Sequence, residues 1–155
     1  MEININCDLG EKSKFHSTEN DPDLLSIVNS ANVACGYHAG DEETMNKVIK
    51  ISKKNGVSVG AHPSFNDPDN FGRKRINLNS TEITKLIIDQ YKILQEITQN
   101  YDENVTHIKP HGALNNMACE DFDLANTIAK AINSISKDII FLVPTGSQME
   151  LAGKK

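Results

Sequence analysis

Apolar and polar residues follow two periods along the chain, and short segments of strand character alternate with longer segments of helical character. The segments with strand character are 2–7, 31–37, 57–61, 105–109 and 139–143. Between them, apolar residues recur at helical spacing, most clearly over 80–99. This alternation predicts an α/β fold with a parallel sheet, either open or closed into a barrel.

Residues typical of helix ends lie at the borders of these segments. Asp21, followed by proline, supplies an N-cap and a first-turn proline for one helix. Asp41 is the predicted N-cap of the next helix, and Gly56 is its predicted end. Asp121 or Asp123 begins a later helix. The last strand segment is apolar throughout, which predicts a strand covered on both faces.

The polar faces of four predicted strands end in ionisable side chains. Successive side chains point to opposite faces of a strand, and by this parity Asp8, His38, His62 and His111 all end polar faces. Lys109 shares its face with His111, and a buried lysine is costly unless it is paired. Active sites collect at the carboxyl ends of parallel strands, and histidine transfers protons near neutral pH. We therefore expect these five residues to form one catalytic cavity.

Four further polar residues lie close to these strand ends in the sequence. Asn6 shares the face of Asp8, and Arg73 is able to bind a carboxylate or phosphate through two hydrogen bonds. Glu11 and Asp41 each follow a predicted site residue by three positions. We expect Asn6, Glu11, Asp41 and Arg73 to bind substrate. Helix capping also explains Asp41, and solvent exposure in a loop also explains Glu11 and Arg73.

Composition narrows the class of protein. The formal net charge is -5, from 16 Lys and Arg against 21 Asp and Glu, which argues against a nucleic-acid surface. The three cysteines are an odd set without C-x-x-C spacing, which is typical of reduced thiols. No signal peptide is visible, and no apolar run approaches the ~20 residues of a membrane span. We expect a single cytoplasmic domain over 1–155 with neither nucleic-acid nor membrane partners.

Five segments resemble, in order and spacing, the motifs of the LamB/YcsF family. They are 4–11 (NINCDLGE), 30–41 (SANVACGYHAGD), 60–63 (GAHP), 71–73 (FGR) and 107–114 (HIKPHGAL). The resemblance implies a seven-stranded, parallel β/α-barrel-like fold related to polysaccharide deacetylases. It also implies ATP-dependent cleavage of 5-oxoproline (pyroglutamate) to L-glutamate with release of ADP and phosphate. The chain would be the A subunit of a multi-subunit 5-oxoprolinase, with the B and C subunits as partners.

The ATP requirement, with Mg²⁺ as its companion ion, rests on the resemblance alone. The sequence contains no G-x-x-x-x-G-K-[ST] phosphate loop. Gly36 and Gly40 flank a predicted helix N-terminus, where backbone amides bind phosphate, but Asp41 would repel it. Opening a lactam needs a base, an acid and a cation for the developing charge. We expect Asp8 or His111 as the base, His38 or His62 as the acid, and Lys109 as the cation.

The chain ends at Lys155 after five predicted strands, whereas a full β/α barrel takes about 250 residues. We therefore expect only about the first five βα units, with open edges at the first and last strands and with Ile140 and Leu142 partly exposed.

Two other interpretations of the sequence stay open. In the first, the chain is an inactive, truncated remnant. In the second, it is a metal-dependent amide hydrolase similar to the deacetylases. The second interpretation would use Asp8, His38, His62 and His111 as ligands for a divalent ion.

Overall fold

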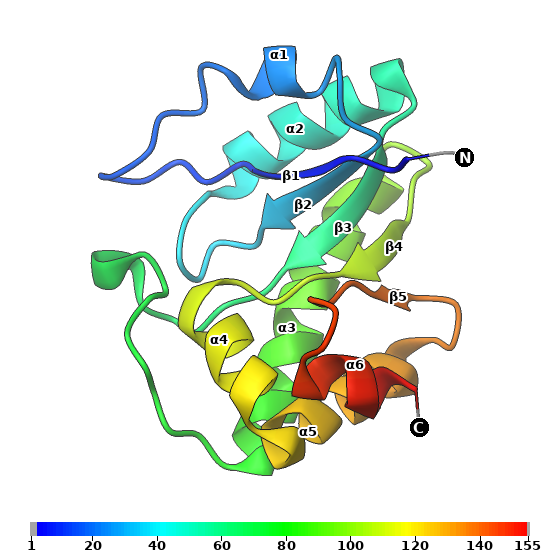
Figure 1. The fold of residues 1–155 in the computed structure, drawn as a ribbon. Helices are drawn as coiled ribbons and strands as arrows, with labels where there is room; N and C mark the ends of the chain where they lie inside the picture. The colour runs from blue at the N-terminus through cyan, green and yellow to red at the C-terminus, as the bar shows by residue number, and fades with distance from the viewer. Residues whose placement is uncertain (1–2, 155) are drawn as a thin grey trace.

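A computed structural model of the protein describes residues 3–154, which contain five strands in one sheet (Figure 1). The strands are β1 (Asn6–Leu9), β2 (Ser30–Ala34), β3 (Ser58–His62), β4 (Val105–Ile108) and β5 (Ile140–Phe141). They pair in sequence order, and every neighbouring pair is parallel. The predicted parallel α/β architecture is confirmed.

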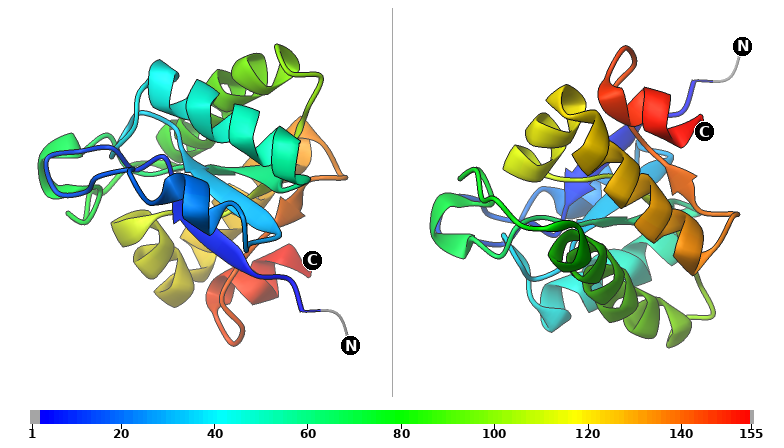
Figure 2. Two further views of the ribbon diagram at one scale, coloured as in Figure 1. Left: turned by 90° about the horizontal axis from the view of Figure 1, so that it is seen from above. Right: turned by 90° about the horizontal axis from the view of Figure 1, so that it is seen from below.

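Helices connect the strands and cover one side of the sheet (Figures 1 and 2). They are α1 (Asp21–Leu24), α2 (Glu42–Asn55), α3 (Ser80–Gln99), α4 (Gly112–Glu120), α5 (Phe122–Ile135) and α6 (Gln148–Gly153), with a 3₁₀ turn over Pro68–Asn70. α2 and α3 pack against the sheet, α5 packs on α3, and α6 packs on α5. Within residues 3–154, no helix combines the length and the apolarity needed to cross a bilayer.

The core lies between the sheet and these helices. Val33 of β2 and Ala61 of β3 are fully buried there, together with Ile49 of α2 and with Ile87 and Leu94 of α3. Burying a side chain such as Ile or Leu contributes roughly 1.5–3 kcal/mol. The apolar faces that strand parity predicted are thus the faces covered by helices.

The predicted helix ends are largely confirmed. Asp41 Oδ1 accepts a hydrogen bond from the Thr44 amide at 2.8 Å, and Gly56 ends α2 in the left-handed conformation with φ 68°. Asp121, not Asp123, is the N-cap of α5. α4 and α6 were not predicted; they are short helices of 9 and 6 residues. The prediction of Asp21 as the N-cap of the first helix is wrong: Asp21 is the first residue of α1 (Asp21–Leu24), and its N-cap is Asn20.

Both outer strands differ from their predicted ranges. β1 begins at Asn6 instead of residue 2, and Ile3 and Ile5 are 75% and 53% exposed, because its neighbour β2 begins only at Ser30. Residue 2 lies outside the described residues. β5 has two paired residues, and Ile140 is 61% exposed. The prediction of a strand covered on both faces is wrong, because no helix within residues 3–154 buries Ile140. The expected exposure of Ile140 at an open edge is confirmed, since β5 has β4 as its one neighbour in the described sheet.

Candidate active site

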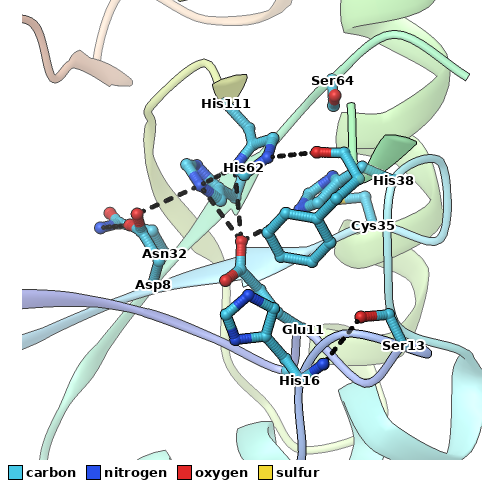
Figure 3. Close-up of polar contacts among 12 residues, drawn as sticks. Asp8, Glu11, Ser13, His16, Asn32, Cys35, His38, His62, Ser64 and His111 are labelled. Carbon is cyan, nitrogen blue, oxygen red and sulfur yellow. Dashed lines mark hydrogen bonds and ion pairs between the residues drawn. The ribbon is translucent and has the colours of Figure 1, made fainter. Parts of the chain in front are cut away.

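The carboxyl ends of the strands bring together four of the predicted site residues (Figure 3). Asp8 lies in β1, His38 follows β2, His62 ends β3, and His111 is the N-cap of α4. His62 Nε2 lies 3.4 Å from Asp8 Oδ2 and 3.0 Å from His111 Nδ1. The rings of His38 and His111 stack with their centroids 3.8 Å apart. The predicted convergence is confirmed.

The chain after β4 continues along β3, and this pairing places Lys109 and His111. The Lys109 amide donates to the Ala61 carbonyl at 3.0 Å, and the His111 amide donates to the Pro63 carbonyl at 2.8 Å. A register irregularity at Val59 precedes this stretch. The extended backbone therefore carries both side chains to the site.

Asp8 is paired with Lys109, the cation that the sequence analysis assigned to the site. Lys109 Nζ donates to both carboxylate oxygens, at 2.6 and 2.8 Å, and Asn32 Nδ2 donates to Oδ1 at 2.8 Å. Burial acts to raise the pKa of Asp8, but the contacts with His62 and Lys109 outweigh it and hold the pKa well below its usual range. Asp8 is therefore a charge-balanced carboxylate at neutral pH.

Glu11 occupies the centre of the three histidines. Its Oε1 lies 3.1 Å from His38 Nε2, 3.3 Å from His111 Nδ1 and 3.8 Å from His62 Nε2. Burial acts to raise the pKa of Glu11, but the hydrogen bond with His38 and the charges of the three rings lower it overall. Glu11 is thus an ionised member of the site, and it is not a solvated loop residue.

Backbone carbonyls orient two of the imidazole rings. His62 Nδ1 donates to the Lys109 carbonyl at 2.6 Å, and His111 Nε2 donates to the Phe71 carbonyl at 2.9 Å. Because a carbonyl oxygen only accepts, the opposite nitrogens of the neutral rings, His62 Nε2 and His111 Nδ1, carry lone pairs. Burial, followed by the nearby charges of His38 and His62, lowers the pKa of His111 to about 4. His111 is therefore a neutral proton acceptor at pH 7.

Phe71 and Gly72 form a wall of the site that the sequence analysis did not assign. The Phe71 ring meets the rings of His38 and His111 edge to face, with centroids 5.4 and 5.1 Å apart. A Cβ on Gly72 would lie 2.1 Å from Ser64 Oγ and 2.9 Å from His38 Cβ, and its φ is +64°. Only glycine fits this close approach. The single signal in the sequence was the Phe-Gly-Arg segment.

A second layer of polar residues supports Asp8 from below. His107 Nε2 donates to Asn32 Oδ1 at 2.9 Å, and Asn32 in turn donates to Asp8 and to Asn6. The His107 ring reaches Asn32 by crossing Gly60, where a Cβ would lie 2.2 Å from the ring. His107 is two residues before Lys109 and so shares its polar face by strand parity, but nothing in the sequence pairs His107 with Asn32, which is 75 residues away.

The remaining predicted residues do not enter the histidine cluster. Asp41 is exposed, caps α2 and pairs with Lys12 Nζ at 3.1 Å, so its structural role accounts for it. Arg73 is exposed, and its guanidinium lies 5.3 Å from the centroid of the Phe71 ring. Asn6 Oδ1 accepts a hydrogen bond from Asn32 Nδ2 and is linked to the site through that contact. Substrate binding by these three residues stays a prediction.

Four side chains form a group that could hold a metal ion. Glu11, His38, His62 and His111 each offer one ligand atom, and these atoms lie within 4.8 Å of one another. Asp8, which the sequence analysis included in its alternative ligand set, is outside this group and has both oxygens paired with Lys109.

Comparison with known proteins agrees with the motifs. The chain is 43% identical to the A subunit of 5-oxoprolinase from Nitrobacter hamburgensis, covering 99% of this chain and 61% of the relative. It is 40% identical to the corresponding 5-oxoprolinase chain of Natranaerobius thermophilus, covering 99% and 60%. The crystal structure of a lactam utilization protein from Thermus thermophilus matches with a TM-score of 0.94 at 32% identity, over 99% of this chain and 62% of that one. The chain therefore spans less than two thirds of the length of these relatives. The LamB/YcsF family matches over residues 3–155, and the chain belongs to that family.

Proposed function

We propose that this chain provides the ring-opening site of an ATP-dependent 5-oxoprolinase, which converts 5-oxoproline to L-glutamate with release of ADP and phosphate. The observation that carries the proposal is the cluster at the strand ends, where the Asp8–Lys109 ion pair adjoins three buried histidines and Glu11. The relatives, which are named as A subunits of 5-oxoprolinase, support the choice of substrate. Their name also supports assembly with further subunits, which we take to be the B and C subunits.

His111 is the better candidate for the base. Water must lose a proton as it attacks the lactam carbonyl carbon, and His111 Nδ1 offers a lone pair because Nε2 is bound to the Phe71 carbonyl. Both oxygens of Asp8 contact Lys109 and its pKa is lowered, which makes Asp8 a weak base. Asp8 is better suited to holding the Lys109 ammonium in place.

Lys109 and His38 complete the set of roles. The Lys109 ammonium stabilises negative charge that develops on the carbonyl oxygen during attack. The C–N bond of the ring then breaks, and the departing nitrogen takes a proton from His38 Nε2, which faces Glu11 at 3.1 Å. His62 lies between Asp8 and His111, with Nε2 3.4 Å from Asp8 Oδ2 and 3.0 Å from His111 Nδ1, and we assign it no separate proton transfer. ATP, when bound, would supply a phosphoryl group to the amide oxygen, which makes the carbonyl carbon easier to attack. After the ring opens, a second water molecule would release this group from the new carboxyl group as phosphate.

The N-terminus of α2 does not fit the ATP phosphates. Asp41 Oδ1 already accepts the Thr44 amide at 2.8 Å, so a carboxylate occupies the position that a phosphate would take. We therefore assign no phosphate contact to this helix, and the proposal leaves ATP binding to the assembled enzyme.

The test is glutamate release from 5-oxoproline, measured with and without ATP and with and without the B and C subunits. We expect ATP-dependent release in the complex and a loss of about 10²-fold or more in kcat for His111→Asn and Lys109→Met. His16→Asn is the matched control, because His16 stacks on Phe71 at 4.6 Å but contacts none of the proposed groups. Wild-type rates in both site variants would refute the proposed roles, and no release by the complex would favour an inactive remnant.

A metal-dependent amide hydrolase is the second candidate, and the four-residue group around Glu11 favours it. That enzyme would hydrolyse its amide without ATP and would lose activity on treatment with a chelator. Ring opening that requires ATP argues against it.

A further inference from the structure

We propose that Glu11, His38, His62 and His111 bind one divalent transition-metal ion of the zinc type, through three nitrogens and one oxygen. The inference goes beyond the proposed reaction, because such an ion would bind whether or not the substrate is a lactam. With the ion bound, His111 and His38 would be ligands, so the base and acid roles proposed above belong to the metal-free site. It differs from the metal set expected from the sequence, since Glu11 replaces Asp8.

The spacing of the donor atoms matches a tetrahedral site. Zinc binds nitrogen and oxygen ligands at about 2.0–2.2 Å, so two donors of a tetrahedral site lie roughly 3.3–3.6 Å apart. His62 Nε2 and His111 Nδ1 are 3.0 Å apart. Glu11 Oε1 lies 3.1, 3.3 and 3.8 Å from the ring nitrogens of His38, His111 and His62. The four donor atoms all lie within 4.8 Å of one another, and the rings of His38 and His111 are stacked. To surround an ion, these two rings must tilt toward it, and the widest donor pairs must close by up to about 1 Å.

The orientation of the rings leaves electron pairs facing one another. The carbonyls of Lys109 and Phe71 take the N–H groups of His62 and His111, so two lone pairs meet beside the Glu11 carboxylate. A shared proton would satisfy one of these contacts and leave the others unfavourable. A divalent cation makes all of them attractive. Carbonyl acceptors on the far ring nitrogen are also the usual outer contacts of metal-binding histidines.

His38 is able to complete the set. Its ring is fully buried, and Nδ1 has no hydrogen-bond partner among the described residues. Without an ion, the ionised Glu11 carboxylate accepts from Nε2 at 3.1 Å, so the ring proton lies on Nε2. Because Nδ1 has no partner among the described residues, the proton is able to move to Nδ1 and leave the Nε2 lone pair for an ion.

The donor set also selects the kind of ion. Imidazole nitrogens suit zinc and related transition metals, whereas Mg²⁺ and Ca²⁺ prefer oxygen ligands. The other carboxylate of the site, Asp8, has both oxygens paired with Lys109 and is not free to add oxygen donors. The Mg²⁺ that accompanies ATP is therefore not the ion expected at this position.

The binding test uses Zn²⁺ alone, without lactam or ATP, so its outcome is separate from that of the activity test. The protein is stripped with a chelator, titrated with Zn²⁺ in excess Mg²⁺, and assayed for bound metal by elemental analysis and calorimetry. We expect one Zn²⁺ per chain. Glu11→Gln and His62→Gln should weaken binding by more than the roughly 10–100-fold that losing an outer contact costs.

Three comparisons decide the result. His16→Asn should bind Zn²⁺ as the wild type does, because His16 lies outside the four-residue group. Zn²⁺ should raise the unfolding temperature of the wild type but not that of either ligand variant, which separates lost binding from a damaged fold. The visible spectrum of Co²⁺ in place of Zn²⁺ should report tetrahedral coordination. A wild type that binds no Zn²⁺, or ligand variants that bind it equally well, would overturn the proposal.

Discussion

Replacing Gly60 with alanine should displace the His107 ring that supports the site from below. An added Cβ would lie 2.2 Å from two atoms of that ring, whereas ordinary contacts are 3.4–4 Å. The ring must therefore move by more than 1 Å. It cannot do so and keep its 2.9 Å hydrogen bond to Asn32, the residue that donates to Asp8.

The expected loss of folding stability has two contributions. Overpacking a core position costs about 1–3 kcal/mol, and His107 is 4% exposed. Losing its hydrogen bond leaves Asn32 Oδ1 buried without its donor, which costs a further 1–3 kcal/mol or so. We expect Gly60→Ala to lower the free energy of unfolding by about 3 kcal/mol. In a His107→Ala background the same change should cost less than about 0.5 kcal/mol, because the new methyl group then enters vacated space.

The assay is a double-mutant cycle measured by urea unfolding. The protein contains no tryptophan, so far-UV circular dichroism is the suitable signal. We expect a coupling free energy of about 2–3 kcal/mol between positions 60 and 107. Gly153→Ala is the control glycine, because its Cβ would lie at an ordinary 3.6 Å from Phe141. Equal costs of Gly60→Ala in the two backgrounds would show that the close approach to His107 is not what requires glycine.

Three further outcomes are expected. Burial, with smaller effects from the charges of His62 and Lys109, lowers the pKa of His107 to about 4. As the pH falls, His107 therefore takes up a proton in the unfolded chain before it does so in the folded protein. Between pH 7 and 5, in the presence of a chelator, the free energy of unfolding of the wild type should fall by about 2 kcal/mol more than that of His107→Gln. Parallel pH dependence of the two proteins would contradict this. Burial raises the pKa of Cys35 to about 12, so in native protein at pH 8 a thiol reagent should modify only the two other cysteines, with Cys35 reacting after denaturation. Gly72→Ala should destabilise the protein by roughly 2–4 kcal/mol in urea unfolding, because it combines overlap with a positive φ; a change below about 0.5 kcal/mol would contradict this.

Strand parity predicted the site residues because side-chain direction is a local property of a strand. His38, His62 and His111 lie on different segments, yet each ends a polar face, and parallel pairing brings those ends to one edge. The long amphipathic helix α3 was predictable for the same local reason. What the sequence pattern did not predict is which elements pack beside each strand. The apolar run around Ile140 predicted a strand covered on both faces, and only the expected number of strands indicated correctly that this strand would be an exposed edge.

The conformation of the loops also could not be predicted from the sequence, and it decides which loop residues enter the site. Glu11 follows β1 through Gly10, which has a φ of +71° and donates its amide to Asp21 Oδ2 at 2.9 Å. That turn directs Glu11 toward the histidines, and the pattern of apolar residues in the sequence does not predict it. Arg73 has the chemistry of a substrate anchor but lies exposed over the Phe71 ring. Residue type alone therefore did not separate a loop residue inside the site from one outside it.

The two carboxylates of the site are three residues apart and have different electrostatic partners. Asp8 has a lysine, which balances its charge. The ion pairs of Glu11 within residues 3–154 are with histidines only, and burial keeps the pKa of two of these, His38 and His111, below the ordinary value. The hydrogen bond with His38 and the charges of the rings lower the pKa of Glu11, but within the described residues no lysine or arginine pairs with it. A buried carboxylate in that position attracts a cation and repels the carboxylate that 5-oxoproline carries. An ion held by Glu11 and the histidines would reverse this repulsion, and Lys109 would remain free to stabilise charge on the reacting carbonyl.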